Sequence, residues 1–183
     1  MKLLGKLVVY TGPMKCGKTT HLIKQYKNLN NKYNNCIFLK PVIDNRFSND
    51  FIIDRDKQNK IKAYNINSID EIIQYTTYKN IFIDEFQFLK GNICTINTLL
   101  ELKCNLYVGG LNLTAEKKPF GEMGNLMCFA DTIHKLRGNC DYCKKQNSGV
   151  YTLYEGGKDQ DIVVGENNYK CVCSKCYIKY SNL

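Results

Sequence analysis

Predominantly apolar runs alternate with helical patterns over the first 110 residues. Four such runs suit strands that are buried on both faces of a parallel sheet: residues 6–10, 36–40, 81–84 and 106–110. Between them, apolar side chains recur at helical spacing in two sets: Leu22, Ile23, Tyr26 and Leu29, then Ile93, Ile96, Leu99 and Leu100. Ser68 followed by Glu71 resembles a capping box and predicts a short helix. The pattern therefore predicts an α/β fold.

The pattern changes after about residue 111. Residues 111–125 combine glycine, proline and charge without periodicity, and predict a long loop of the kind that often serves as a lid. Two β-rich runs, 149–155 and 161–164, are joined by a glycine-containing turn and predict a hairpin. We therefore expect two parts: residues 1–138, an α/β domain that includes the loop, and residues 139–183, a small C-terminal domain.

Length and cysteine content narrow the class of protein. The chain has 183 residues, enough for one domain and a small appendage. No run reaches the ~18 apolar residues of a membrane span, and the N-terminus lacks the cleavage site of a secretory signal. We therefore expect a cytoplasmic protein without a membrane partner. In that setting, ten cysteines indicate reduced thiols or a metal site.

The net charge of +9 leaves two interpretations open. Clustered basic residues give affinity for nucleic acid through counterion release. However, 23 of the 26 basic residues are lysines spread along the chain, and the arginines are Arg46, Arg55 and Arg137. A solvated lysine surface that suits an anionic nucleotide is the other interpretation. The charge therefore supports, as an alternative function, an ATPase that binds nucleic acid.

The segment from Gly12 to Thr19 matches the phosphate-binding pattern G-x-x-x-x-G-K-[ST]. Gly12 and Gly17 allow the backbone N–H groups to turn toward phosphate oxygens, and the following helix contributes its positive N-terminal end. Lys18 would reach the β- and γ-phosphates, and the Thr19 hydroxyl would bind Mg²⁺. A strand is expected before the segment and a helix after it, as this P-loop requires.

Two carboxylates follow the predicted strand at 81–84. Asp84 is the expected partner of Mg²⁺, directly or through water, because carboxylates suit this hard cation. Glu85 is a candidate general base that accepts a proton from an attacking hydroxyl or water, with a solvated acid at the strand end as the alternative. These parts fit a motor, a switch or a kinase. The chain has no room for a second motor domain, which favours a kinase.

Two Cys-x-x-Cys pairs predict a structural zinc site. They are Cys140 with Cys143 and Cys173 with Cys176, separated by 29 residues that the predicted hairpin would occupy. Four thiolates from two such turns give the tetrahedral set that Zn²⁺ prefers. Cys171 is a poorer partner because one residue separates it from Cys173. A redox dithiol and unliganded thiols are the alternatives.

The order of these motifs resembles the cytosolic-type, zinc-containing (type II) thymidine kinase family of cellular and viral enzymes. The resemblance covers residues 5–178 and includes GPMKCGKT, DNRF, DEFQF, LTAEKKPFG and the two cysteine pairs. It implies a P-loop NTPase-type parallel sheet with a zinc domain whose lasso loop closes on the substrate. It also implies transfer of the γ-phosphoryl of ATP, with Mg²⁺, to the 5′-hydroxyl of thymidine in pyrimidine salvage. A homotetramer that binds a small nucleoside and no nucleic acid is implied as well.

The resemblance also assigns roles to individual residues. Glu85 matches the proton acceptor, and Asp84 belongs to the metal site. The donor-binding set is Gly12, Pro13, Met14, Lys15, Cys16, Gly17, Lys18, Thr19, Asp44, Asn45, Arg46, Asp84 and Gln87. The substrate-binding set is Met14, Phe88, Ala115, Phe120, Asp161, Ile162, Val163, Val164, Gly165 and Tyr169. Phe88, Phe120 and Tyr169 have a core position as the alternative.

Several positions depart from the family pattern, among them Ile53, where a histidine is usual, and the stretch before Tyr169, which is one residue shorter. The family commonly has a small residue at Phe86, an aromatic residue at Ala115 and an aspartate at Asn112. These departures concern the shape of the substrate pocket, and hence whether deoxyuridine is accepted beside thymidine. They leave the predicted phosphate chemistry unchanged.

Overall fold

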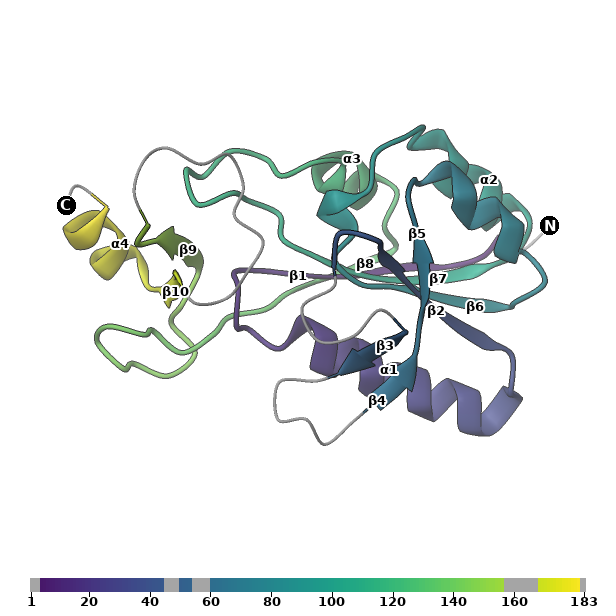
Figure 1. Ribbon diagram of the computed structural model, residues 1–183, viewed down its shortest axis with the longest axis horizontal. Coiled ribbons are helices and arrows are strands. Elements are labelled where there is room, and N and C mark those ends of the chain that lie inside the picture. Colours follow the sequence, from purple (N-terminus) through teal and green to yellow (C-terminus); the bar gives the residue numbers. More distant parts are fainter. Residues whose placement is uncertain (1–3, 45–49, 54–59, 157–167, 182–183) are drawn as a thin grey trace.

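A six-stranded parallel sheet forms the centre of the molecule (Figure 1). The structure is a computed structural model that describes residues 4–44, 50–53, 60–156 and 168–181. The strand order is β5-β2-β6-β7-β1-β8. The strands are β1 (Leu7–Thr11), β2 (Cys36–Pro41), β5 (Tyr64–Ile66), β6 (Asn80–Ile83), β7 (Asn105–Gly110) and β8 (Thr132–Lys135). The four strands expected from the apolar runs are confirmed, and they are the four central ones.

Alternating side chains along these strands build two separate cores, because successive residues of a strand point to opposite faces. Toward one face, Leu7 and Val9 of β1 pack with Ile81 and Ile83 of β6. Helix α2 (Cys94–Glu101), the 3₁₀ helix η1 (Asp70–Tyr75) and helix α3 (Met123–Cys128) lie on this side of the sheet (Figure 1). The runs appear continuously apolar because both faces of the sheet are covered.

Helix α1 (Lys18–Tyr33) covers the opposite face (Figure 1). Its buried Leu22 and Ile23 pack against Phe38 and Phe82, and Tyr26 lies at the margin of this second core. A short antiparallel ribbon of β3 (Phe51–Ile53) and β4 (Lys60–Lys62) extends the same layer. The helical face expected for α1 is confirmed.

One local expectation is corrected, and two strands were not expected. The segment after Ser68 is a 3₁₀ helix without a side-chain cap at its N-terminus. The Glu71 carboxylate instead accepts a hydrogen bond from the Asn67 N–H, at 3.1 Å. The edge strands β5 and β8 were not expected, because Tyr64–Ile66 and Thr132–Lys135 are short and partly or fully exposed, so neither has an apolar run.

The C-terminal residues form a small lobe at one end of the molecule (Figure 1). We call residues 139–156 and 168–181 the cysteine module. Strand β9 (Tyr151–Tyr154) pairs with β10 (Tyr169–Val172), and helix α4 (Ser174–Tyr180) follows. The segment 161–164, expected to pair with β9, lies outside the described residues. Leu153, Val172 and Tyr177 form the module's own apolar cluster, together with Cys140 and Cys176.

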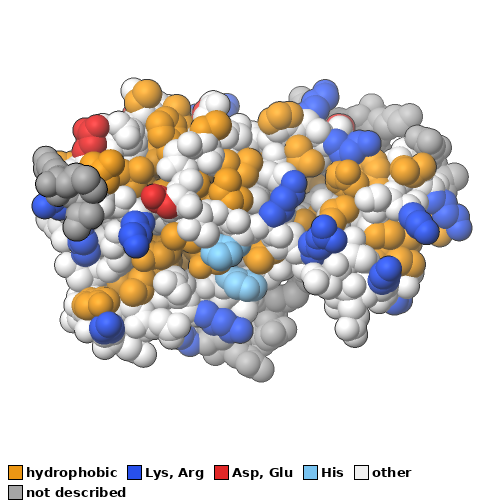
Figure 2. Space-filling model, turned by 180° about the vertical axis from the view of Figure 1, so that it is seen from behind, with side chains coloured by type: hydrophobic (Ala, Val, Ile, Leu, Met, Phe, Trp, Pro, Cys, Tyr) orange, Lys and Arg blue, Asp and Glu red, His pale blue; other side chains and the backbone are white. Residues whose placement is uncertain are grey.

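Lysine side chains are dispersed over the surface. Figure 2 shows Lys and Arg scattered among apolar and neutral side chains, without one continuous basic stripe on the face in view. Among the described residues, no helix has the length and apolar character needed to cross a membrane.

Candidate active site

The P-loop connects β1 to α1 at the carboxyl end of the sheet. Gly12 has a φ of 144°, and a side chain there would lie 2.4 Å from the Leu136 carbonyl oxygen, so only glycine fits. Gly17 precedes the helix with a φ of 87°. The Lys18 ammonium is buried and donates to the Pro13 carbonyl at 2.8 Å. The P-loop backbone therefore surrounds the ammonium group of Lys18.

Thr19 and Asp84 meet at the end of β6. The Thr19 hydroxyl donates to Asp84 Oδ2 at 2.6 Å, joining α1 to the strand that ends beside it. Asp84 is buried, and its Oδ1 accepts the backbone N–H of Glu85 at 3.1 Å. A side chain at Gly109 would lie 2.8 Å from Asp84 Oδ1, so glycine makes room for the carboxylate. A hydroxyl and a carboxylate so close are suitable ligands for Mg²⁺.

Glu85 is buried and held in place by Gln87. Its backbone is left-handed, with a φ of 52°, which an ordinary strand end does not require. The Gln87 side-chain amide donates to Glu85 Oε2 at 2.6 Å, and its carbonyl accepts the Leu111 N–H at 2.9 Å. Glu85 is therefore not a solvated acid, and Gln87 connects it to the first residue of the loop 111–125.

The loop expected at 111–125 is shorter than predicted, because helix α3 begins at Met123, and the part before the helix folds back on itself. Leu113 and Pro119 form an antiparallel bridge, and the Phe120 N–H donates to the Asn112 carbonyl at 3.2 Å. At the tip, the Tyr177 hydroxyl of α4 donates to the Ala115 carbonyl at 2.7 Å. The loop is therefore ordered and contacts the cysteine module, as a loop that encloses a ligand would.

Several side chains expected to bind substrate are half-buried near this loop. Phe88 and Phe120 make an edge-to-face contact with ring centroids 5.5 Å apart. Tyr169 of β10 packs on Tyr154, with centroids at 4.8 Å. Met14 and Ala115 are also half-buried. Phe86, by contrast, is fully buried in the core on the α2 side of the sheet. Its side chain is therefore not exposed where these half-buried side chains lie.

Some expected site residues are not described. Asn45, Arg46, Asp161, Ile162, Val163, Val164 and Gly165 lie outside the described residues. Asp44 is the last residue before the first of these gaps; it is buried, and its carbonyl accepts the Lys40 ammonium at 2.9 Å. Lys40 is itself buried, although no motif in the sequence gave it a role.

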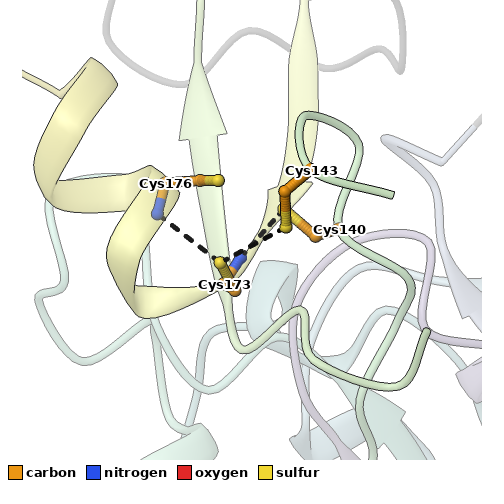
Figure 3. A group of neighbouring side chains, drawn as sticks. All are labelled: Cys140, Cys143, Cys173 and Cys176. Carbon is orange, nitrogen blue, oxygen red and sulfur yellow. Dashed lines mark hydrogen bonds between the residues drawn. The ribbon is translucent and has the colours of Figure 1, made fainter. Parts of the chain in front are cut away.

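The four cysteines predicted to bind metal lie together (Figure 3). The Sγ atoms of Cys140, Cys143, Cys173 and Cys176 all lie within 4.8 Å of one another. The Cys143 and Cys173 sulfurs are 3.8 Å apart, close to the ~3.8 Å between ligands of a tetrahedral Zn²⁺ with Zn–S near 2.3 Å. Cys171 is buried elsewhere, against Gly138 and Gly149. The donor set therefore fits a closed zinc site, and Cys171 is not part of it.

Backbone N–H groups surround these sulfurs. Burial raises the pKa of Cys140, but backbone hydrogen bonds from Cys173, Cys143 and Tyr142 outweigh it and lower the pKa to about 6. The Cys176 N–H in turn donates to Cys173 Sγ at 3.5 Å. Metal binding needs thiolates, and the N–H groups around Cys140 favour its thiolate form.

Three residues that link the parts of the site were not expected from the sequence. Tyr177 binds the loop tip, Thr152 accepts the Met14 N–H at 3.0 Å, and Asp141 lies 3.9 Å from the Lys15 ammonium. Tyr177 follows Cys176 directly and Asp141 follows Cys140 directly, so the sequence places both beside predicted metal ligands but does not indicate their contacts. The sequence does not mark Thr152, because it lies within an ordinary strand pattern.

A P-loop after β1, an Asp-Glu step at the end of β6 and a loop held by a cysteine module define a P-loop nucleotide-binding protein. The thymidine kinase family model matches residues 5–177. The chain belongs to this family and is a nucleoside kinase.

Individual relatives come from cells and viruses. A thymidine kinase of Mycoplasma mobile is 35% identical, over 96% of this chain and 88% of its own length. A thymidine kinase of Choristoneura fumiferana entomopoxvirus is 32% identical, over 92% of this chain and 94% of its own. Thymidine kinase 1 of Dictyostelium discoideum is 29% identical, over 96% and 79%. The kinase interpretation is therefore confirmed over the nucleic-acid-binding ATPase.

Proposed function

We propose that this protein transfers the γ-phosphoryl group of ATP to the 5′-hydroxyl of thymidine, with Glu85 as general base. The observation that carries the proposal is the contact of Thr19 with Asp84 at 2.6 Å, beside a Glu85 carboxylate fixed by Gln87. Donor, metal and proton-accepting groups thereby converge where two parallel strands end. Thymidine as the substrate rests on the relatives, all of which are named thymidine kinases.

The P-loop would hold the donor. Lys18 would exchange its carbonyl contacts for phosphate oxygens, and residues 12–17 would direct backbone N–H groups at them. Thr19 and Asp84 would hold Mg²⁺, which offsets the charge on the transferred phosphoryl. Asp44, Asn45, Arg46 and Gln87 complete the proposed donor set; the contacts of Gln87 make its role the support of Glu85.

Glu85 would accept the proton of the 5′-hydroxyl. A sugar hydroxyl is a weak nucleophile, and a positioned carboxylate increases the rate as the oxygen attacks phosphorus. Glu85 is 8% exposed, so the site excludes most of the water that would compete for the phosphoryl group. The hydrogen bond from Gln87 Nε2 to Oε2 holds the Glu85 carboxylate in one orientation.

The loop 111–125 would enclose the thymine base. Phe88 and Phe120 supply apolar walls, and the folded loop presents backbone groups for hydrogen bonding. Met14, Ala115, Tyr169 and residues 161–165 complete the proposed pocket. The cysteine module would hold structural Zn²⁺ and keep the loop in place through Tyr177. A two-part division at residue 138, a homotetramer and a cytoplasmic location accompany the proposal.

The test is ATP-dependent phosphorylation across the deoxynucleosides, with product identity checked by mass spectrometry. We expect thymidine to give the highest kcat/KM and deoxyuridine to be the only other substrate of comparable rate. Turnover of purine deoxynucleosides with neither of these would contradict the substrate assignment. Omitting Mg²⁺ should abolish turnover.

A further inference from the structure

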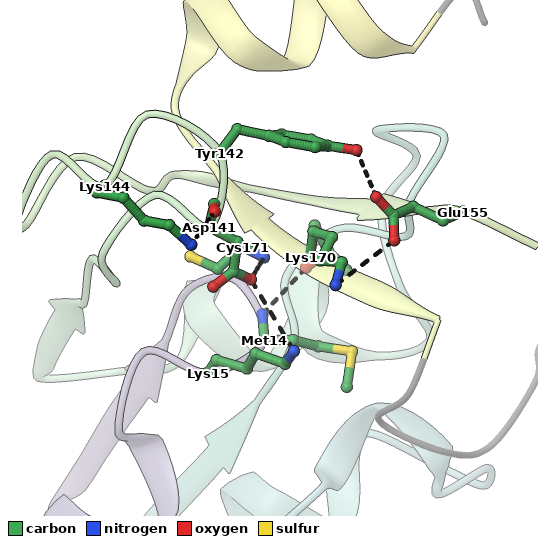
Figure 4. Close-up of polar contacts among 9 residues, drawn as sticks. Met14, Lys15, Asp141, Tyr142, Lys144, Glu155, Lys170 and Cys171 are labelled. Atoms are coloured by element: carbon green, nitrogen blue, oxygen red, sulfur yellow. Dashed lines mark hydrogen bonds and ion pairs between the residues drawn. The ribbon is translucent and has the colours of Figure 1, made fainter.

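The P-loop contacts the cysteine module at two polar points (Figure 4). The Met14 N–H donates to the Thr152 hydroxyl at 3.0 Å. The Lys15 ammonium lies 3.9 Å from Asp141 Oδ2, with the two side chains 19% and 33% exposed. Lys15 thus points to the module, whereas Lys18 is bonded within the loop itself.

A third contact is a close backbone approach. A side chain at Gly138 would lie 3.2 Å from the Lys15 carbonyl oxygen and 2.6 Å from Cys171 Sγ. Gly138 and Gly149 are paired by two backbone hydrogen bonds, at 3.1 and 2.8 Å. Glycine at position 138 therefore lets the Lys15 backbone lie close to the Gly138–Gly149 pair, beside the Cys171 side chain of β10.

Asp141 lies between Cys140 and Cys143, two of the four cysteines of the candidate zinc site. Its N–H donates to the Cys171 carbonyl at 2.7 Å, and its Oδ2 accepts the Cys171 N–H at 2.8 Å. Backbone and side chain are both fixed to β10, which leads into Cys173. The Asp141 carboxylate is thereby connected, through β10, to the second Cys-x-x-Cys pair.

We propose that Lys15 and Asp141 are a positioning pair, through which metal loading of the cysteine module raises the affinity of the P-loop for the donor triphosphate. The inference rests on the proposed donor site. Lys15 acts through the loop backbone, whose φ at Lys15 is 63°, rather than as a phosphate ligand. Because coupling between two binding sites is reciprocal, the donor must raise zinc affinity by the same factor.

The experiment is a double-mutant cycle on the zinc-loaded full-length protein. Lys15→Gln, Asp141→Asn and the double variant are compared with wild type for the Kd of a fluorescent ATP analogue with Mg²⁺. Asn keeps an oxygen for the Cys171 N–H, and zinc content is checked in each preparation. Because each single variant loses a partly exposed ion pair, we expect its Kd to rise about three- to fivefold. The double variant should show no further rise, since both changes remove one interaction.

Zinc affinity gives the second readout. Chelator competition is measured with and without the ATP analogue, and the analogue should raise zinc affinity in wild type but not in Lys15→Gln or Asp141→Asn. Lys144→Gln is the matched control; its ammonium binds the Asp141 backbone carbonyl, and both readouts should stay at the wild-type value.

Two results would overturn the pair. Lys15→Gln could weaken analogue binding while Asp141→Asn does not, which would make Lys15 a direct phosphate ligand. Alternatively, the two single effects could add in the double variant. Failure of wild type itself to bind the analogue is a different result, because it would contradict the donor site.

Discussion

The Gln87 side chain connects the Glu85 carboxylate to Leu111, the first residue of the loop after β7. Its amide donates to Glu85 at 2.6 Å, and its carbonyl accepts the Leu111 N–H at 2.9 Å. Gln87 is 3% exposed, so neither bond competes with water. The orientation of the proposed base and the start of the loop are therefore set by one amide.

Glu85→Gln should remove the proton acceptor and leave the fold intact. The substitution keeps the size of the side chain, and an amide cannot accept the proton of the 5′-hydroxyl. We expect kcat to fall by about 10²–10⁴, with the Kd of the ATP analogue close to wild type. Steady-state kinetics and a binding titration check this. A variant that retains near-wild-type kcat would contradict the assignment of the base.

Gln87→Leu should impair both stability and catalysis. The change keeps the approximate volume but removes the bond to the Glu85 carboxylate and leaves the buried Leu111 N–H without its acceptor. An unsatisfied buried N–H costs about 1–3 kcal/mol, so the free energy of unfolding should fall by at least that amount, and kcat/KM should fall with it. Denaturant unfolding and kinetics measure the two effects.

Asn97→Leu is the matched control for Gln87→Leu. Its exposed amide donates to Glu101 at 3.0 Å on α2, and water can replace that bond. We expect a change within about 0.5 kcal/mol and unaltered kinetics. Equal destabilisation by the two variants would show that the buried bridge has no special role.

Cys173→Ser should release the metal and loosen the cysteine module. Removing one of four thiolates leaves an incomplete tetrahedral set, and zinc binding free energy contributes to the folding of such small units. We expect less than one zinc per chain, a lower Tm and a higher KM for thymidine, and a chelator should reproduce all three in wild type. Cys94→Ser, at an exposed position on α2, is the control. Full zinc retention in Cys173→Ser would contradict the ligand set.

Tyr177→Phe should weaken nucleoside binding without affecting zinc. It removes only the hydroxyl that binds the Ala115 carbonyl at 2.7 Å. The loss of one such hydrogen bond, about 0.5–1.5 kcal/mol, predicts a rise of about two- to tenfold in the KM for thymidine. Tyr180→Phe is the control, since its ring stacks on Tyr142 within the same module. An unchanged KM in Tyr177→Phe would contradict the prediction, because the hydrogen bond from α4 to the loop would then not contribute to nucleoside binding.

The elements that the sequence predicted share one property: their signal is local. The central strands are continuous apolar runs because both faces are covered, and the P-loop and the cysteine pairs carry their chemistry in fixed spacing. Strand β8 could not be predicted, since the four residues Thr132–Lys135 are all exposed and pair only along one edge. The contacts of Asp141 and Tyr177 likewise join residues 126 and 62 positions apart. Sequence periodicity does not indicate such contacts, because they depend on how the cysteine module packs against the P-loop and the loop after β7.

Stability should decline at alkaline pH partly through Cys104. Burial raises the pKa of this thiol above its ordinary value of 9.0, although the nearby Lys79 lowers it in part. The folded state therefore keeps the proton at a pH where the unfolded chain loses it. The stabilising contribution is complete below about pH 9, is lost as the pH rises toward the folded-state pKa, and changes by up to about 1.4 kcal/mol per pH unit.

Cys104→Ala should therefore flatten the loss of stability above pH 9. The variant starts from a lower free energy of unfolding because a buried sulfur is removed, but one proton-linked difference between the two states disappears. Denaturant unfolding between pH 7 and pH 10.5 would show the curves of wild type and variant converging as the pH rises. Parallel curves over that interval would mean that the Cys104 thiol ionises equally in both states, and that its burial has no electrostatic cost.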